Sequence, residues 1–208
     1  MRAIIFLVMS LVASISYAEQ QDALELLNTI MASEELTKKA YAAGEERISL
    51  CGYCHGRDGN STRPNIPNLA EQSAVYLFSA FEKYASGERS DFVMTQAANM
   101  LSIEERVNIA LYYGMQKVKE KKSVNPALDA LGEQRFNTVC TACHGLDGKG
   151  MDDAPRLAGQ PAPYVRHALH GFRDDSDYRP GSMMLPIAAQ LSNQDIEALA
   201  SYIQGLNP

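Results

Sequence analysis

One five-residue pattern, Cys-x-x-Cys-His, occurs twice in this chain of 208 residues, and its two copies contain all four cysteines. The copies are Cys51-Gly-Tyr-Cys54-His55 and Cys140-Thr-Ala-Cys143-His144. Three further landmarks follow each copy in the same order: a Pro-x-Leu-Ala segment, a tyrosine, and a methionine seven residues before a Leu-Ser pair. Such an ordered internal repeat predicts two units of one fold, one in each half of the chain.

Each copy of the motif has the residues that covalent haem attachment requires. Two thiols at this spacing form thioethers with the two vinyl groups of one porphyrin, and the adjacent histidine ligates the iron. A thioredoxin-like redox pair would need a βαβ context, which neither half shows. A single zinc ribbon would space its two cysteine pairs by about 15–20 residues, whereas 85 residues separate Cys54 from Cys140. Plain disulfides would leave both histidines unexplained. The sequence therefore predicts two covalently bound haem c groups, attached at Cys51, Cys54, Cys140 and Cys143 and ligated by His55 and His144.

Residues 1–18 are typical of a secretory signal peptide. Arg2 precedes an apolar run over residues 3–12, and the small residues Ser16 and Ala18 flank a cleavage site. The apolar run is short and is soon followed by polar residues, which disfavours a membrane-spanning helix; an uncleaved anchor is the alternative. We therefore expect an exported protein, which in a bacterium means the periplasm, where c-type haem is attached.

The formal net charge is −6, and removal of the predicted signal peptide with its single arginine makes it −7. This balance argues against nucleic acid as a partner, because nucleic-acid-binding domains are basic. Between the two units stand four lysines, which are typical of an exposed connector. A docking patch for an acidic redox partner is the alternative interpretation of Lys117, Lys119, Lys121 and Lys122.

Both units are predicted to be all-α. Helices are expected over residues 37–50 and 126–139 before the motifs and over 74–86 and 162–173 in the middle of each unit. Closing helices are expected after Ser102 and Ser192, where an acid three residues later completes a capping box, Glu105 in the first unit and the weaker Asp195 in the second. An amphipathic helix over residues 22–31 has no counterpart in the second unit. The predicted division is a signal peptide (1–18), an N-terminal extension (19–36), a first domain (37–116), a linker (117–125) and a second domain (126–208).

A second axial iron ligand decides whether such a haem carries electrons or binds small molecules. A methionine thioether closes the iron and raises its reduction potential. Met94 and Met184 occupy equivalent places in the repeat, eight residues before the serines that begin the closing helices, and are therefore the predicted ligands. Met183 is the direct rival of Met184, although the alignment matches it to Val93. The remaining histidines have no counterparts in the first unit and are expected on the surface: His167 and His170.

The ordered landmarks resemble those of a class I cytochrome c in each half, and residues 37–206 as a whole resemble the dihaem cytochrome c4 family. The match rests on both haem motifs, the Pro-x-Leu-Ala segments, Met94 and Met184, and the similar endings 109–113 and 199–203. The resemblance implies that the first and last helices of each unit cross, with Gly44 and Ile48 against Tyr112, and Gly132 and Phe136 against Tyr202. It also implies that the carbonyls of Pro67 and Pro155 orient the histidines, and that haem propionates lie near the domain interface. Arg89 and Arg179 could meet these propionates; solvent-exposed arginines are the alternative interpretation.

The same resemblance implies an electron carrier without catalytic residues. Its expected partners are redox proteins, a quinol-oxidising complex as donor and a terminal oxidase as acceptor; peripheral association with the membrane is compatible with this role. One alternative is a cytochrome subunit of a periplasmic dehydrogenase, such as a flavoprotein sulfide dehydrogenase or an alcohol dehydrogenase. Another is an enzyme with one open iron, such as a dihaem peroxidase or a thiosulfate-oxidising cytochrome. The additional helix over residues 22–31 departs from a minimal member of the family.

Overall fold

The computed structural model describes residues 23–151, 153–175 and 177–206, and the predicted signal peptide lies outside these ranges. Within them the chain is helical, apart from an isolated β-bridge between Met151 and Ala154. None of the helices in these ranges is long and apolar enough to cross a membrane. Besides an N-terminal helix over residues 23–31, the helices are α2 (Glu34–Arg47), α3 (Gly52–His55), α4 (Ala74–Ser86), α5 (Phe92–Met100), α6 (Ile103–Gly114), α7 (Asp129–Arg135), α8 (Thr141–His144), α9 (Ala162–Asp174), α10 (Met184–Ala188) and α11 (Asn193–Gly205), with a 3-10 turn η1 (Pro126–Leu128) and a π-helical turn η2 (Phe136–Cys140).

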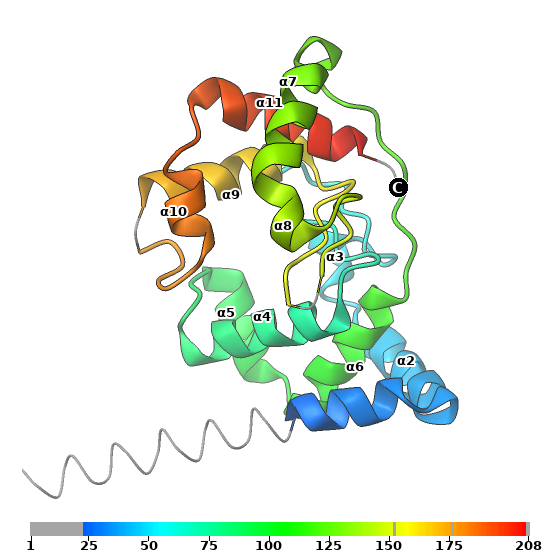
Figure 1. Ribbon diagram of the computed structural model, residues 1–208. Helices are drawn as coiled ribbons and strands as arrows, with labels where there is room; N and C mark the ends of the chain where they lie inside the picture. The colour runs from blue at the N-terminus through cyan, green and yellow to red at the C-terminus, as the bar shows by residue number, and fades with distance from the viewer. Residues whose placement is uncertain (1–22, 152, 176, 207–208) are drawn as a thin grey trace, which may run out of the picture.

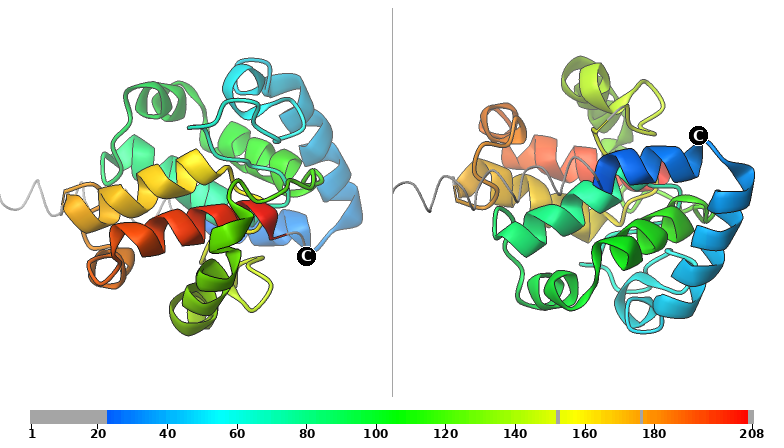
Figure 2. Two further views of the ribbon diagram at one scale, coloured as in Figure 1. Left: turned by 90° about the horizontal axis from the view of Figure 1, so that it is seen from above. Right: turned by 90° about the horizontal axis from the view of Figure 1, so that it is seen from below.

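These helices form two units of similar construction (Figure 1). Helices α2 to α6 make the first unit, in the lower part of that view, and α7 to α11 make the second above it, while the connector 115–125 runs along one edge. In each unit the first helix packs across the last, α2 on α6 and α7 on α11, and the middle helices α4 and α9 pack on the same partners. In Figure 2, the second unit lies in front of the first when seen from above and behind it when seen from below. The predicted all-α tandem architecture is confirmed.

Local capping explains where the middle and closing helices begin. The Ser73 hydroxyl accepts from the N–H of Tyr76 (3.2 Å), and Gly87, at φ +82°, ends α4 in the left-handed conformation that favours glycine. Ser102 and Ser192 cap α6 and α11, and each is part of a complete capping box. The second box, expected to be the weaker, is therefore formed as fully as the first.

Asp195, the acid of the second capping box, also forms an ion pair with Arg135 of α7, with 2.6 Å between Oδ1 and Nε. Burial raises the pKa of the Asp195 carboxyl, but hydrogen bonds from Ser192 and Arg135 outweigh it and leave the pKa below its usual range. A depressed folded-state pKa contributes stability above the unfolded pKa of about 3.9, and this stability is lost as the pH falls through the folded pKa.

We therefore expect Asp195→Asn to lower the free energy of unfolding at pH 7 by about 1–3 kcal/mol. The substitution removes the buried carboxylate that pairs with Arg135 and accepts hydrogen bonds from Ser192. The variant should also lose less stability than the wild type between neutral pH and acid. Thermal unfolding followed as a function of pH measures both effects. An unchanged acid sensitivity would show that Asp195 does not contribute to the pH dependence.

Glycine permits the close crossing of the first and last helices in each unit. A Cβ on Gly44 would lie 2.3 Å from the carbonyl oxygen of Asn108, and one on Gly132 would lie 2.4 Å from that of Ala198. Next to the second crossing, the rings of Phe136 and Tyr202 lie 5.6 Å apart between centroids. The crossing implied by the family resemblance is thus present in both units.

Gly132→Ala is expected to destabilise the second unit by about 1–3 kcal/mol, because the methyl group forces α7 away from α11. Chemical denaturation followed by helical circular dichroism measures the loss. Ala130→Ser, which adds one atom at an exposed site on the same helix, is the matched control and should have little effect. Equal stability of Gly132→Ala and the wild type would contradict the close approach.

The structure corrects the predicted boundaries of the opening helices. The first of them begins at Glu34 rather than residue 37, because Ser33 caps it by accepting from the N–H of Leu36, and it ends at Arg47, before three turn residues lead into the haem motif. The single helix expected over 126–139 is instead η1, α7 and η2 in succession. Pro126 fits the first turn of η1, and the wide π turn ends at Cys140. π turns frequently occur at functional sites.

The additional N-terminal helix, residues 23–31, belongs to the first unit in packing. Ala23, Leu27 and Ile30 are buried in that unit's core. The Thr37 hydroxyl donates to the carbonyl of Ile30 (2.8 Å), which ties this helix to α2. The segment therefore enlarges the first core, and the described residues of the second unit provide no equivalent.

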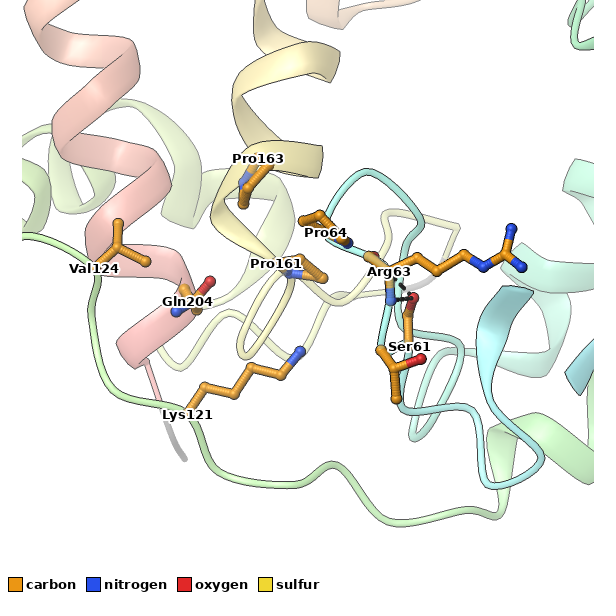
Figure 3. A pocket seen from close by; sticks show the side chains of 9 residues that line it. Ser61, Arg63, Pro64, Lys121, Val124, Pro161, Pro163 and Gln204 are labelled. Carbon is orange, nitrogen blue, oxygen red and sulfur yellow. Dashed lines mark hydrogen bonds between the residues drawn. The ribbon is translucent and has the colours of Figure 1, made fainter. Parts of the chain in front are cut away.

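A groove of about 380 Å³ opens where the connector passes both units (Figure 3). The loop containing Arg63 and Pro64 forms one side, Pro161 and Pro163 form the other, and Lys121 of the connector extends between them. Gln204 fixes the connector here, because its side chain donates to the carbonyl of Lys122 (2.8 Å) and accepts from the N–H of Ala162 (2.9 Å).

Candidate haem-attachment sites

The two Cys-x-x-Cys-His motifs adopt the same local structure. Each forms a single helical turn, α3 in the first unit and α8 in the second, that ends at the histidine. The glycine after each histidine has a positive φ, +78° at Gly56 and +79° at Gly145, which turns the chain away from the helix. No disulfide joins the four cysteines, and the two motifs lie in different units (Figure 1).

Both histidines are held in one orientation by a backbone carbonyl. The Nδ1–H of His55 donates to the carbonyl of Pro67 (3.0 Å), and that of His144 donates to the carbonyl of Pro155 (2.8 Å). The side chains are buried, with exposed fractions of 8% and 6%. Burial lowers the pKa of both imidazoles, although the carbonyls oppose the shift. A neutral imidazole that donates through Nδ1 presents its Nε2 lone pair to a metal.

The first cysteine of each motif is unsuited to thiol–disulfide exchange. Burial raises the pKa of Cys51, and it raises that of Cys140 to about 11. Redox-active Cys-x-x-Cys pairs depend on a lowered thiol pKa, because the thiolate is the nucleophile. The raised thiol pKa values therefore argue against a thioredoxin-like pair.

Met94 and Met184 both lie in the first turn of short helices that the sequence did not predict. Met94 is in the first turn of α5, and Met184 is the first residue of α10. Both side chains are half-buried and pack against the core of their own unit. Met183, by contrast, is 78% exposed. The difference in exposure between Met183 and Met184 therefore agrees with the repeat alignment that favours Met184.

Arg89 and Arg179, one from each unit, both interact with Tyr164 at the boundary between the units. Burial would raise the pKa of the Tyr164 phenol, but Arg89 of the first unit and Arg179 of the second hold it below its usual range. The Arg179 guanidinium lies 4.9 Å from the ring centroid of Tyr178, and its Nε is buried without a hydrogen-bond partner. An unpaired buried donor suits an acidic group such as a haem propionate, so the residues present fit the predicted cofactor.

The histidines outside the motifs lie on the surface of α9. His167 is exposed, and its ring stands edge-on to that of Tyr178, 6.1 Å away between centroids. His170 Nδ1 lies 3.1 Å from a carboxylate oxygen of Asp174. Both positions agree with the expected surface role.

Two buried glutamines join the units and were not predicted from the sequence: Gln72 and Gln160. They stand 88 residues apart, the same offset as Pro67 and Pro155. This shared offset could have identified the two glutamines as equivalent positions of the repeat. A glutamine, however, belongs to no motif that marks it as functional.

The comparisons with known proteins agree with this construction. A family model of cytochrome c matches residues 130–207. Cytochrome c4 of Pseudomonas aeruginosa is 38% identical over 200 residues, which cover 88% of this chain and 99% of that protein. The crystal structure of reduced recombinant cytochrome c4 from Pseudomonas stutzeri superposes with a TM-score of 0.73 at 37% identity, covering 80% of this chain and 98% of that one. The thiosulfate dehydrogenase electron acceptor of Thiomonas intermedia is 28% identical over 81% of this chain and 85% of its own length.

Fold and motifs together define an electron-transfer protein with two class I cytochrome c domains in tandem. The chain belongs to the cytochrome c4 family. Covalent haem c and an electron-transfer role, both predicted from the sequence, are confirmed as properties of the family.

Proposed function

We propose that this chain is a periplasmic dihaem cytochrome that carries electrons from a membrane quinol-oxidising complex to a terminal oxidase. The observation that carries the proposal is the duplicated site: each unit has a Cys-x-x-Cys-His turn, a buried histidine oriented by a proline carbonyl, and a half-buried methionine at the same place in the repeat. Haem c, when bound, supplies one-electron chemistry at its iron.

The residues divide this task between attachment and ligation. Cys51 and Cys54 would hold one haem, and Cys140 and Cys143 the other, through thioethers. His55 and His144 would ligate iron through Nε2, because Nδ1 of each is already bonded to a proline carbonyl. The second iron ligands would be the thioethers of Met94 and Met184, which close the metal to other molecules and raise its potential. No substrate is transformed in this account.

Membranes that contain the terminal oxidase test the direction of transfer. The purified, reduced protein should be oxidised by such membranes in air, and the rate should fall when the oxidase is inhibited. The oxidised protein should be reduced by quinol only when the quinol-oxidising complex is present. Failure of both reactions, with protein that contains haem, would contradict the proposed partners.

A second candidate is a cytochrome subunit that receives electrons from a periplasmic dehydrogenase. The Thiomonas intermedia relative, a thiosulfate dehydrogenase electron acceptor, favours this possibility. Mild purification from the periplasm distinguishes the two, because a stable subunit would bring a second polypeptide and its dehydrogenase activity with it.

A further inference from the structure

Two glutamine side chains, one from each domain, bind the backbone of the opposite domain. Gln160 accepts from the N–H of Asn68 (2.9 Å) and donates to its carbonyl (2.8 Å). Gln72 accepts from the N–H of Arg156 (2.7 Å) and donates to its carbonyl (3.1 Å). All four residues are at most 4% exposed. We call this pair of glutamines the crossed amide clamp.

The clamp acts on the peptide groups that orient the histidines. The carbonyl of Pro67, which holds His55, and the N–H of Asn68, which binds Gln160, are the two ends of one planar peptide group. A continuous path of hydrogen bonds and one peptide bond therefore runs from His55 of the first domain to Gln160 of the second.

The second domain repeats this arrangement in the opposite sense. The carbonyl of Pro155 holds His144, and the N–H of Arg156, on the same peptide group, binds Gln72 of the first domain. Each histidine is thus connected to a glutamine of the other domain.

We propose that Gln160 and Gln72 are positioning residues that set the strength of the hydrogen bond on the histidine of the opposite domain. Hydrogen bonds in a chain polarise one another. Donation from the Asn68 N–H to Gln160 makes the Pro67 carbonyl oxygen more negative, so that it binds the Nδ1–H of His55 more strongly. A stronger bond at Nδ1 makes the imidazole a more basic ligand, which favours oxidised iron and lowers its potential. The inference rests on the proposed role of His55 and His144 as iron ligands.

The test is nuclear magnetic resonance of the reduced protein with its two haems, labelled with ¹⁵N in histidine. The Nδ1–H signals of His55 and His144 are assigned from their proximity to Pro67 and Pro155. In Gln160→Met we expect the His55 signal to move upfield and its exchange with solvent to become roughly fivefold faster, the factor that corresponds to one typical hydrogen bond. The His144 signal should stay in place, while Gln72→Met should give the reciprocal result. A redox titration should show one potential raised in each variant.

Two further variants separate polarisation from loss of interface packing. Gln160→Glu keeps an acceptor for the Asn68 N–H, so the His55 signal should stay at or downfield of its wild-type position. If Gln160→Met does not fold, Gln72→Met tests the proposal through the His144 signal. Gln204→Met removes a glutamine that makes the same kind of double contact, but with Ala162 and Lys122, and should leave both histidine signals unchanged.

Changes confined to the histidine of the mutated domain, or equal changes at both histidines, would overturn the proposal. So would unchanged signals in both methionine variants. A wild-type protein without two histidine-ligated haems would instead refute the proposed function, so the two failures are distinguishable.

Discussion

Replacing Met184 with alanine is expected to remove the thioether ligand from the second haem and to halve the weak far-red absorption band of the oxidised protein. The band reports a methionine bond to ferric iron, and the account assigns one such bond to each domain. Loss of this ligand should also lower the potential of one haem and open that iron to cyanide or carbon monoxide. Absorption spectra and a redox titration of the variant measure these changes.

Met183→Ala is the matched control for this prediction. Met183 is its neighbour in sequence but is largely exposed, whereas the Met184 side chain packs against the core. The control should keep the full far-red band and bind neither cyanide nor carbon monoxide. The reverse result, with ligation lost only in Met183→Ala, would show that the repeat alignment is wrong by one residue.

A chain in which Cys51 and Cys54 are both alanine is expected to contain one haem instead of two. Without thioethers, only weaker contacts would hold a haem in the first domain, so we expect that haem to be lost. Burial of the porphyrin then no longer contributes to folding of that domain. The pyridine haemochrome spectrum counts the haems per chain, and thermal unfolding should show a separate, less stable transition.

The reciprocal variant, with alanine at Cys140 and Cys143, should also retain one haem and should lose the transition of the second domain instead. Two haems in either double variant would contradict the assignment of the cysteines. An absence of haem from both would mean that attachment at the two sites is interdependent, which the account does not predict.

The sequence was most informative where a local pattern determines structure. The bounds of α4 were predicted correctly, because its apolar residues recur at helical spacing between a serine cap and Gly87. The capping boxes at Ser102 and Ser192 located the closing helices in the same way. The glycine crossings followed from family resemblance, and spacing alone would not have given them.

The missed features depend on tertiary contacts. Helix α10 is five residues long and contains Pro186, so no helical period marks it. The π turn before Cys140 replaces what the pattern predicted as continuous helix, since propensity does not distinguish the two. The role of Gln160 exists only because the second domain lies against the Pro67–Asn68 peptide, and side-chain type gives no sign of that.

The central claim is that both motifs hold a closed, methionine-ligated haem. The most direct test is the absorption spectrum of the purified protein, oxidised and reduced, with a pyridine haemochrome count. The account predicts two c-type haems per chain, the far-red methionine band in the oxidised state, and no change on addition of cyanide or carbon monoxide. One haem per chain, a high-spin feature, or rapid ligand binding at either iron would contradict it.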